Sequence, residues 1–447
     1  MAEGDHLVLF PEVSLLECFL AFFPEARAYH GGLSPKEREA FFQNPQGLVF
    51  ATYGGLLLPF TPRSLVVVEE GSESYKLPSG SRAFLPPLAE LRARLLKVPL
   101  TYLSLVPAVE VLEKPGLTFP VPRPRVLLLD LRREKGYPFA GKALALLKQV
   151  EERGRQAVSW RPGRGTAPSS SAPTAATSLP APTAPCLCVT TAQAASSATS
   201  AATRSLRPLF APGATPPFWS PRGPGWSGFE ELKARLSLPL FRYAKEAKDD
   251  LSPLLQEPGV VVGTTALLRG PTLPELALVL LPYADGFLYE SDFRAAERYH
   301  RLLWALTELR PGRRPLLVLQ TYTPDHPAHQ GLLEGSVEAF PWAEKALREA
   351  LDYPPKVRMV KLEVRHRREE RALEAAFALK AALEGVAEEG EVLGPAPAPV
   401  SRVKGFYLYH LLLKGTTQRL EALLSHLDRR KFRLDPDPHR FVGLLED

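Results

Sequence analysis

The sequence is poor in cysteine and has no long apolar run, and both shortages exclude classes of protein. Only three cysteines occur in 447 residues, Cys18, Cys186 and Cys188, too few for a disulfide framework. No apolar run approaches the roughly 20 residues of a membrane-spanning helix, and the N-terminus lacks the pattern of a signal peptide. We therefore expect a cytoplasmic protein without a membrane segment, with two or three domains.

A further shortage is local, because residues 159–217 contain no Asp, Glu or Lys and consist mostly of Ala, Pro, Ser and Thr. A segment of this composition cannot offset its ordering entropy, so we expect residues 159–222 to be largely disordered. Five arginines in this segment carry five of the six net positive charges of the chain. The remainder is nearly neutral, so the overall charge is weak evidence for a nucleic-acid partner.

The order of residues in this segment indicates a shifted reading frame. With each codon read one nucleotide back, residues 169–177 become Leu-Leu-Leu-Cys-Pro-His-Cys-Gly-Tyr. Four alanine pairs can then each become Cys-x-x-Cys: Ala172 and Ala175, Ala181 and Ala184, Ala198 and Ala201, and Ala211 and Ala214. Eight thiolates in four such pairs would bind two tetrahedral Zn²⁺ ions, whereas the alanines of this chain bind none. An ordinary linker is the alternative.

Short apolar runs alternate with helical patterns over the rest of the chain. Strands are predicted at 7–10, 48–51, 64–70, 124–130, 260–263, 276–281 and 316–320, and helices at 35–43, 85–97 and 229–236. This alternation favours parallel sheets covered by helices. After Pro341 the pattern changes to helix 342–351, strand 357–363, helix 368–385, strand 405–413 and helix 416–427. It predicts a small α+β unit with two helices on one face of a sheet.

Several motifs resemble those of the primosomal protein N′ (PriA) family, superfamily 2 helicases that restart stalled replication forks. They are His30–Arg38, Ser74–Lys76, Leu128–Glu134, Val262–Gly270, Asp292–Arg298, Gln320–His326 and Gly394–Ala398. The resemblance implies an α/β protein with two RecA-like lobes, the first truncated, and a C-terminal α+β domain. The implied domains are 1–118, 119–338 and 339–447. The family carries two zinc ions on an insert in its second lobe, where the shifted frame places the cysteine pairs.

Other motifs of the family are altered. The chain begins after the position of the phosphate-binding loop, and Val68-Glu69-Glu70-Gly71 stands where the family has the Mg²⁺-binding Asp-Glu-Glu-His. Residues 104–106 and 308–312 depart from the Ser-Ala-Thr motif and the arginine motif. Because valine cannot coordinate Mg²⁺, we expect no catalytic residue and none of the family's ATP, Mg²⁺ or Zn²⁺. Glu69 and Glu70 are then expected to be solvated carboxylates. Five further helicase-motif positions are Gly263, Thr264, Gly270, Arg294 and Arg298.

Basic and aromatic residues of the C-terminal unit are the candidate DNA surface. One set comprises Arg402, Lys404, Tyr407 and Tyr409, and a second comprises Arg429, Arg430 and Lys431. Such side chains on one sheet face can stack bases and neutralise phosphates, although a charge run is usually a solvated face.

Three functions are weighed. The first is a protein without ATP hydrolysis that binds forked or single-stranded DNA and recruits or loads other replication proteins, with primosome and single-strand-binding proteins as partners. The alternative is an ATP-dependent 3′→5′ helicase, and the third possibility is a gene remnant.

Overall fold

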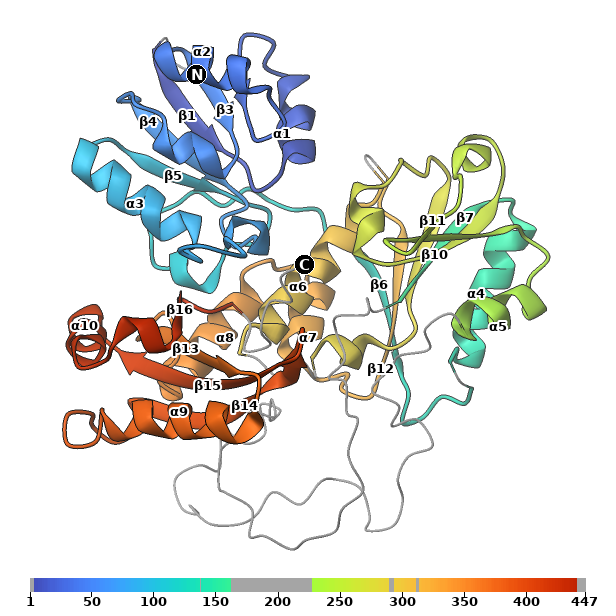
Figure 1. The fold of residues 1–447 in the computed structure, drawn as a ribbon. Coiled ribbons are helices and arrows are strands. Elements are labelled where there is room, and N and C mark those ends of the chain that lie inside the picture. Colours follow the sequence, from blue (N-terminus) through green and yellow to red (C-terminus); the bar gives the residue numbers. More distant parts are fainter. Residues whose placement is uncertain (1–3, 137, 162–226, 289–292, 311–312, 440–447) are drawn as a thin grey trace, which may run out of the picture. The chain divides into compact units, whose positions relative to one another are not determined.

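The computed structural model describes residues 4–136, 138–161, 227–288, 293–310 and 313–439, and the chain divides into two compact units (Figure 1). One unit joins Met1–Gly116 with Glu344–Asp447, and the other is Leu117–Ala343. Within these described ranges, no helix is long and apolar enough to cross a membrane. Residues 162–226 lie outside them, so the shifted frame, the expected disorder and the zinc positions there stay predictions.

Lobe 1, the N-terminal part of the first unit, is a five-stranded parallel sheet in the order β2-β3-β1-β4-β5. Its strands are β1 (His6–Leu9), β2 (Arg27–Tyr29), β3 (Leu48–Ala51), β4 (Ser64–Val68) and β5 (Leu100–Leu103), and its helices are α1 (Val13–Leu20), α2 (Pro35–Gln43) and α3 (Leu85–Leu96). The strands predicted near 7–10, 48–51 and 64–70 are confirmed, although β4 ends before the two glutamates.

Both faces of this sheet are covered, which explains the uninterrupted apolar runs. Leu7 and Leu9 point to the face that packs against α3, whereas Val8 and Phe10 point to the face that packs against Leu16 of α1. Each of the five side chains is at most 4% exposed.

Lobe 2, the second unit, contains a seven-stranded sheet in the order β6-β12-β11-β7-β10-β8-β9. Its strands are β6 (Arg125–Asp130), β7 (Gln156–Trp160), β8 (Leu240–Ala244), β9 (Ala247–Lys248), β10 (Gly259–Gly263), β11 (Leu276–Leu281) and β12 (Leu316–Thr321), and its helices are α4 (Gly141–Glu152), α5 (Ser227–Arg235), α6 (Ala295–Thr307) and α7 (Pro327–Glu334). All neighbours are parallel except β9, which turns back on β8. The predicted α/β class, with parallel sheets, is thereby confirmed.

One boundary drawn from composition is wrong. Ser159 and Trp160, assigned to the expected disordered segment, continue β7 and are 2% and 1% exposed. β7 lies between β10 and β11, so Ser159 pairs with Val262 on one side and Leu280 on the other. This pairing holds both residues in the sheet, and the amino-acid composition around them does not indicate it.

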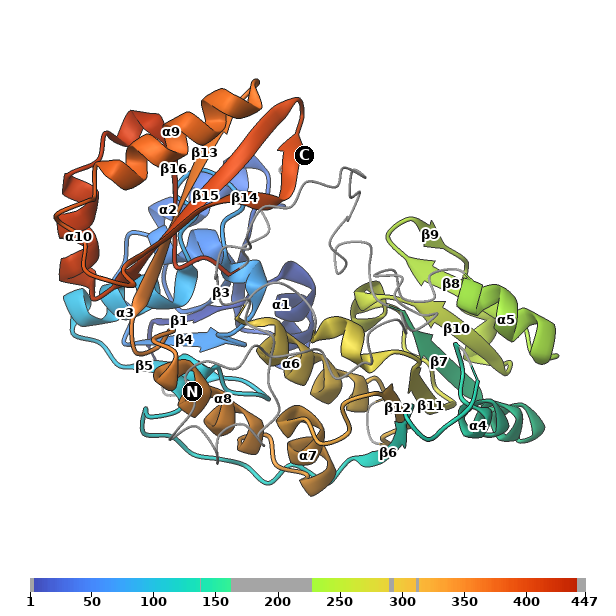
Figure 2. The same cartoon turned by 90° about the horizontal axis from the view of Figure 1, so that it is seen from below.

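The C-terminal domain is an antiparallel sheet in the order β14-β15-β13-β16, preceded by α8 (Ala339–Ala350). Its strands are β13 (Arg358–His366), β14 (Val392–Val403), β15 (Phe406–Gly415) and β16 (Arg433–Pro436), and its helices are α9 (Glu369–Ala381) and α10 (Thr417–Ser425). Both helices cover one face of the sheet, as predicted, and share its core (Figure 2). The two edge strands, β14 and β16, were not predicted from the sequence.

Buried charged side chains join lobe 1 to the C-terminal domain within the first unit. Lys76 Nζ lies 2.8 Å from Asp435 Oδ1, and Lys361 Nζ lies 3.2 Å from Asp435 Oδ2. Lys76 also donates to the carbonyl groups of Pro436 and Asp437. The three side chains of the ion pairs are at most 5% exposed, so one buried carboxylate pairs with two buried ammonium groups.

Candidate functional site

The carboxyl end of β4 carries the altered Val68-Glu69-Glu70-Gly71 motif. Val68 is the last residue of the strand and is 3% exposed. Glu69 follows with a positive φ of 51°, and its Oε1 accepts a hydrogen bond from the Leu105 backbone N–H at 3.0 Å. Glu70 Oε1 accepts one from the Ala108 backbone N–H at 2.7 Å. The motif therefore holds the segment that follows β5.

The expectation that both glutamates are solvated is wrong for Glu70, which is only 2% exposed. Its carboxylate is buried because residues 104–108 pass over the strand end and present a backbone donor to it. The hydroxyl of Tyr75 donates to the carbonyl groups of Leu9 and Val68, both at 2.7 Å, and burial raises its pKa far above the ordinary value of 10.0. The strand end is thus closed by internal hydrogen bonds.

The Gly263–Gly270 motif of lobe 2 folds as a tight turn after β10. A Cβ atom at Gly263 would lie 2.6 Å from the Tyr243 carbonyl oxygen, so any side chain there would force the backbone to shift. Thr264 caps the 3₁₀ helix Thr265–Arg269, since its hydroxyl accepts from the Ala266 N–H at 3.5 Å. Gly270 ends that helix close to the Tyr243 ring. These positions pack the turn against β8.

Arg294 and Arg298 lie at the start of α6, beside an almost buried carboxylate. Glu297 is 5% exposed, and its two oxygens lie 3.2 Å from Arg294 Nη1 and 3.4 Å from Arg301 Nη2. Arg298 is partly buried on the same helix. The guanidinium group of Arg294 also lies 5.0 Å from the centre of the Phe293 ring. A negative charge between two arginines stabilises the first turns of α6.

Three histidines form part of the core beside this helix. His300, His326 and His329 are 0%, 3% and 0% exposed. His329 bonds the Tyr299 hydroxyl at 2.7 Å and the Thr323 carbonyl at 2.9 Å, while His326 Nδ1 accepts from the Ala328 N–H and caps α7. Burial lowers the pKa of all three, to about 3 for His300 and His326. Among the described residues, no three His, Cys, Asp or Glu side chains gather in a way that could hold a metal ion.

The first candidate DNA set lies at one end of the C-terminal sheet, at the β14–β15 hairpin. Arg402 pairs with Tyr407 across the hairpin, and its guanidinium carbon lies 5.3 Å from the centre of the Tyr407 ring. Lys404 is exposed in the turn, with a φ of 47°. Tyr409 is different, because it is 8% exposed in the core under α9 and its hydroxyl donates to Glu369. We therefore leave Tyr409 out of the candidate surface.

Two arginines from the neighbouring strand end extend this set. The guanidinium carbons of Arg365 and Arg367 lie 5.3 and 5.6 Å from the centre of the Phe406 ring. The antiparallel register brings them there, since Arg365 pairs with Leu408 and His366 with Tyr407. The hairpin surface, as we call it, comprises Arg365, Arg367, Arg402, Lys404, Phe406 and Tyr407. Its four cations have no carboxylate partner in the part of the chain that the structure describes.

The second candidate set, Arg429, Arg430 and Lys431, forms a short exposed 3₁₀ helix after α10. Asp428 caps this helix, accepting from the Arg430 N–H at 3.1 Å. The Arg430 side chain is 94% exposed and its Nε lies 3.5 Å from Asp428 Oδ1. These cations are available to a ligand, but the adjacent ring of Phe432 is buried in the core of the domain and offers no stacking surface.

Comparisons with known proteins match this chain to one family. The family model "Primosomal protein N C-terminal domain" matches residues 349–439. The "Probable replication restart protein PriA" of Deinococcus radiodurans is 40% identical over 91% of this chain and 48% of its own length. The "Replication restart protein PriA" of Treponema pallidum is 38% identical over 35% of this chain and 24% of its own length. The chain thus spans about half the length of the first of these relatives.

A solved structure, the "DUF1998 helicase MrfA bound to DNA", aligns with 98% of this chain and 51% of its own chain. Its sequence identity is 12% and the TM-score is 0.39.

Proposed function

The chain belongs to the primosomal protein N′ (PriA) family, and we propose that it works in replication restart as a protein that binds forked or single-stranded DNA and recruits or loads other replication proteins. Primosome proteins and single-strand-binding proteins are the proposed partners. Since the chain spans about half of the D. radiodurans relative, the activity of the whole family protein is not carried over.

The hairpin surface is the observation that carries the DNA proposal. At the hairpin end of the sheet, Arg365 and Arg367 lie beside the ring of Phe406 on one face, and Arg402 lies beside the ring of Tyr407 on the other. Lys404 is exposed in the turn between the two strands. Cations neutralise phosphates and release counterions, and aromatic faces stack on unpaired bases whatever their sequence. An ordinary solvated face would pair its arginines with glutamates, as Arg371 does with Glu374 at 3.0 Å. The surface therefore suits single-stranded DNA at a fork.

The second candidate function, an ATP-dependent 3′→5′ helicase, is favoured by family membership alone. The donor set at the end of β4 does not fit Mg²⁺, since Val68 has no side-chain oxygen, its carbonyl oxygen accepts from Tyr75, and the carboxylates of Glu69 and Glu70 already accept backbone hydrogen bonds. We therefore propose that the chain does not hydrolyse ATP. Titration with ATP, in the presence of DNA and Mg²⁺, separates the DNA-binding protein from the helicase. Hydrolysis of ATP that DNA stimulates would support the helicase instead.

The DNA proposal is tested by fluorescence anisotropy with a forked oligonucleotide at several salt concentrations. Replacing Arg365, Arg367, Arg402 and Lys404 by alanine removes up to four phosphate contacts, so the log–log salt slope should flatten by roughly 3 units. The matched control is Arg371→Ala, which removes an exposed cation that is already paired and should leave the slope unchanged. An unchanged salt slope in the fourfold variant would show that the hairpin surface is only a solvated face and does not bind DNA.

The second set is tested in the same assay. Changing Arg429, Arg430 and Lys431 to alanine should flatten the slope by roughly 2 to 3 units if all three contact phosphates. A fluorescent base analogue in the single-stranded arm distinguishes the two sets. We expect Phe406→Ala to reduce its quenching and the Arg429 set to leave it unaffected, because only the hairpin surface offers rings for stacking.

A further inference from the structure

The strands β14 and β15 are joined by a tight turn of two exposed residues, Lys404 and Gly405. Their φ angles are 47° and 82°, and positive φ at both positions gives a turn whose twist matches that of the flanking strands. Val403 and Phe406 close the turn as the last pair of the ladder. In the described part of the chain, no atom beyond its two chain neighbours lies within 4 Å of a Cβ atom built on Gly405, so the end of this hairpin is open to a ligand.

The two rings beside the turn lie on different faces of the hairpin, because successive side chains of a strand point to opposite faces. Tyr407 is on the face that α9 and α10 cover, since it packs against the core of the domain, and Arg402 is paired with it there. Phe406 is on the other face, together with Arg365 and Arg367 from β13. Each face at the end of the hairpin therefore carries one ring and at least one exposed guanidinium group.

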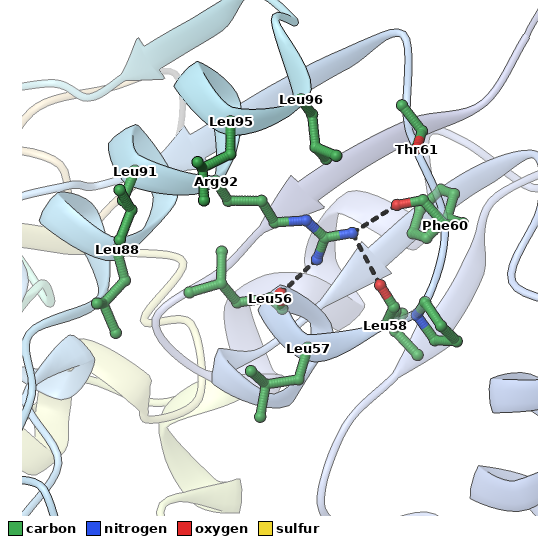
Figure 3. A pocket seen from close by; sticks show the side chains of 11 residues that line it. Leu56, Leu57, Leu58, Phe60, Thr61, Leu88, Leu91, Arg92, Leu95 and Leu96 are labelled. Atoms are coloured by element: carbon green, nitrogen blue, oxygen red, sulfur yellow. Dashed lines mark hydrogen bonds between the residues drawn. The ribbon is translucent and has the colours of Figure 1, made fainter.

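The arginines at the end of the hairpin are available to a phosphate, in contrast to an arginine of lobe 1. The terminal nitrogens of Arg92, on α3, donate to four backbone carbonyl oxygens within residues 55–60 (Figure 3), so that guanidinium group serves the fold. Arg365, Arg367 and Arg402 are exposed, and their guanidinium carbons lie 5.3 to 5.6 Å from the centre of an aromatic ring. A guanidinium plane held in this way can stack on a base while its N–H groups reach a phosphate.

We propose that the β14–β15 hairpin stands at the junction of a DNA fork, between the two unpaired arms, and holds one arm against each of its faces. At a fork junction two unpaired strands leave the duplex in different directions, and unpaired bases are the ones that can stack on protein side chains. A hairpin with a ring and a cation on each face offers each strand its own site. A single strand would have to fold over the turn to reach both rings. This arrangement places Lys404, in the turn, beside the junction.

The division of the two arms between the two faces rests on the proposed DNA binding, and the two are tested separately. The salt slope of the fourfold variant tests whether the hairpin surface binds DNA at all. A fluorescent base analogue placed in one arm at a time tests which face each arm contacts. Failure of the division and failure of DNA binding are therefore different results.

The probes are two forks of one sequence that carry the base analogue at the first unpaired position, one in the 3′ arm and the other in the 5′ arm. With saturating full-length chain, both analogues should be quenched. Phe406→Ala should remove most of the quenching in one arm only, and Tyr407→Ala should remove it in the opposite arm only. Phe406→Tyr and Tyr407→Phe keep the rings and should quench both arms. The matched control is Phe377→Ala, which removes a 52% exposed ring of α9 and should change neither arm.

The arginines provide a second measurement, because they are exposed and their loss leaves the core of the domain intact. Fluorescence anisotropy compares the fork with duplexes that carry the 3′ arm or the 5′ arm alone. The fork should bind at least about tenfold more tightly than either, since the second arm binds to a face already held beside it. Arg402→Ala should weaken binding of one of the one-armed duplexes, and the double change of Arg365 and Arg367 to alanine should weaken binding of the other.

The outcomes separate the possible ligands. If Phe406→Ala and Tyr407→Ala remove quenching in the same arm, or if either variant affects both arms equally, one strand contacts both rings and the division is refuted. Equal affinity for the fork and for a one-armed duplex would also refute it. Quenching that neither variant changes, with a salt slope that the fourfold variant still flattens, would overturn the division and leave the proposed DNA binding intact. Circular dichroism melting checks that each variant is folded.

Discussion

The buried carboxylate of Asp435 should be among the most sensitive positions of the first unit. Asp435→Asn removes the negative charge that lies within ion-pair distance of both Lys76 and Lys361, while keeping the side-chain volume. Removing one partner of a buried pair typically costs about 3–5 kcal/mol, because the remaining charge stays desolvated. Because the variant removes this shared partner from two buried ammonium groups, we expect a loss of at least about 3 kcal/mol at pH 7.

Two further variants should lose less stability than Asp435→Asn. Lys76→Met leaves Asp435 paired with Lys361, so its cost should be about 1–3 kcal/mol. Arg371→Ala breaks the exposed pair with Glu374, whose side chains are more than 60% exposed, and such pairs contribute about 0–1 kcal/mol. The free energies of unfolding come from urea titration followed by circular dichroism, with hydrogen exchange of residues 433–436 as a local probe.

The pH dependence of the Asp435→Asn variant provides an independent check. Burial already lowers the pKa of Lys76 in the intact protein, partly opposed by Asp435. In the variant the folded pKa of Lys76 falls further below the ordinary value of 10.5, so the unfolded state binds more protons than the folded state between that lowered pKa and 10.5. The variant should therefore gain stability as the pH rises toward 10.5. A loss below 1 kcal/mol, or one equal to that of Arg371→Ala, would refute the role of this charge cluster.

Three other outcomes are expected. Gly263→Ala should cost about 1–3 kcal/mol in a urea titration, since its Cβ would overlap the Tyr243 carbonyl oxygen. His300 and His326 have a pKa of about 3 in the folded protein and near 6.5 in the unfolded chain. Lobe 2 should therefore keep its full stability above pH 6.5 and be about 3 kcal/mol less stable at pH 5.5 than at pH 7.5. Hydrogen exchange of residues 295–307 measures this loss, and a stability that does not change with pH would contradict it. Sequencing of the gene should find codons ending in T before Ala172 and Ala175 if the reading frame is shifted.

The central strands were predictable because their apolar runs are buried on both faces, whereas the edges of the C-terminal sheet were not. β14 contains Pro395 and Pro397, residues that normally argue against a strand. Proline is tolerated there because β14 is an edge strand and has one neighbour only. β16 spans four residues, Arg433–Pro436, and has no periodicity to detect. Apolar sequence patterns indicate buried strands, and edge strands are the least buried part of a sheet, so they leave the weakest pattern.

The candidate DNA surface was predictable in part. Alternation correctly put Tyr407 and Tyr409 on one face, but the sequence does not reveal that α9 covers Tyr409. Conversely, Arg365 and Arg367 belong to another strand, and only the register of β13 against β15 brings them to Phe406. Contacts between a helix and a strand in the first case, and between two strands in the second, decided these outcomes.

The end of β4 explains how two acidic residues can have a role in the fold at a position that, as we propose, does not bind Mg²⁺. An aspartate at position 68 would have to be buried to the same 3% as Val68, which is costly for a carboxylate without a cation or a set of hydrogen bonds. Valine removes that cost, and Glu69 and Glu70 are then free to accept from the backbone of residues 105 and 108. A buried N–H without an acceptor costs about 1–3 kcal/mol, so Glu70 satisfies a need of the fold itself. The carboxylates of this motif are therefore accounted for by stability, and their presence alone is no argument for catalysis.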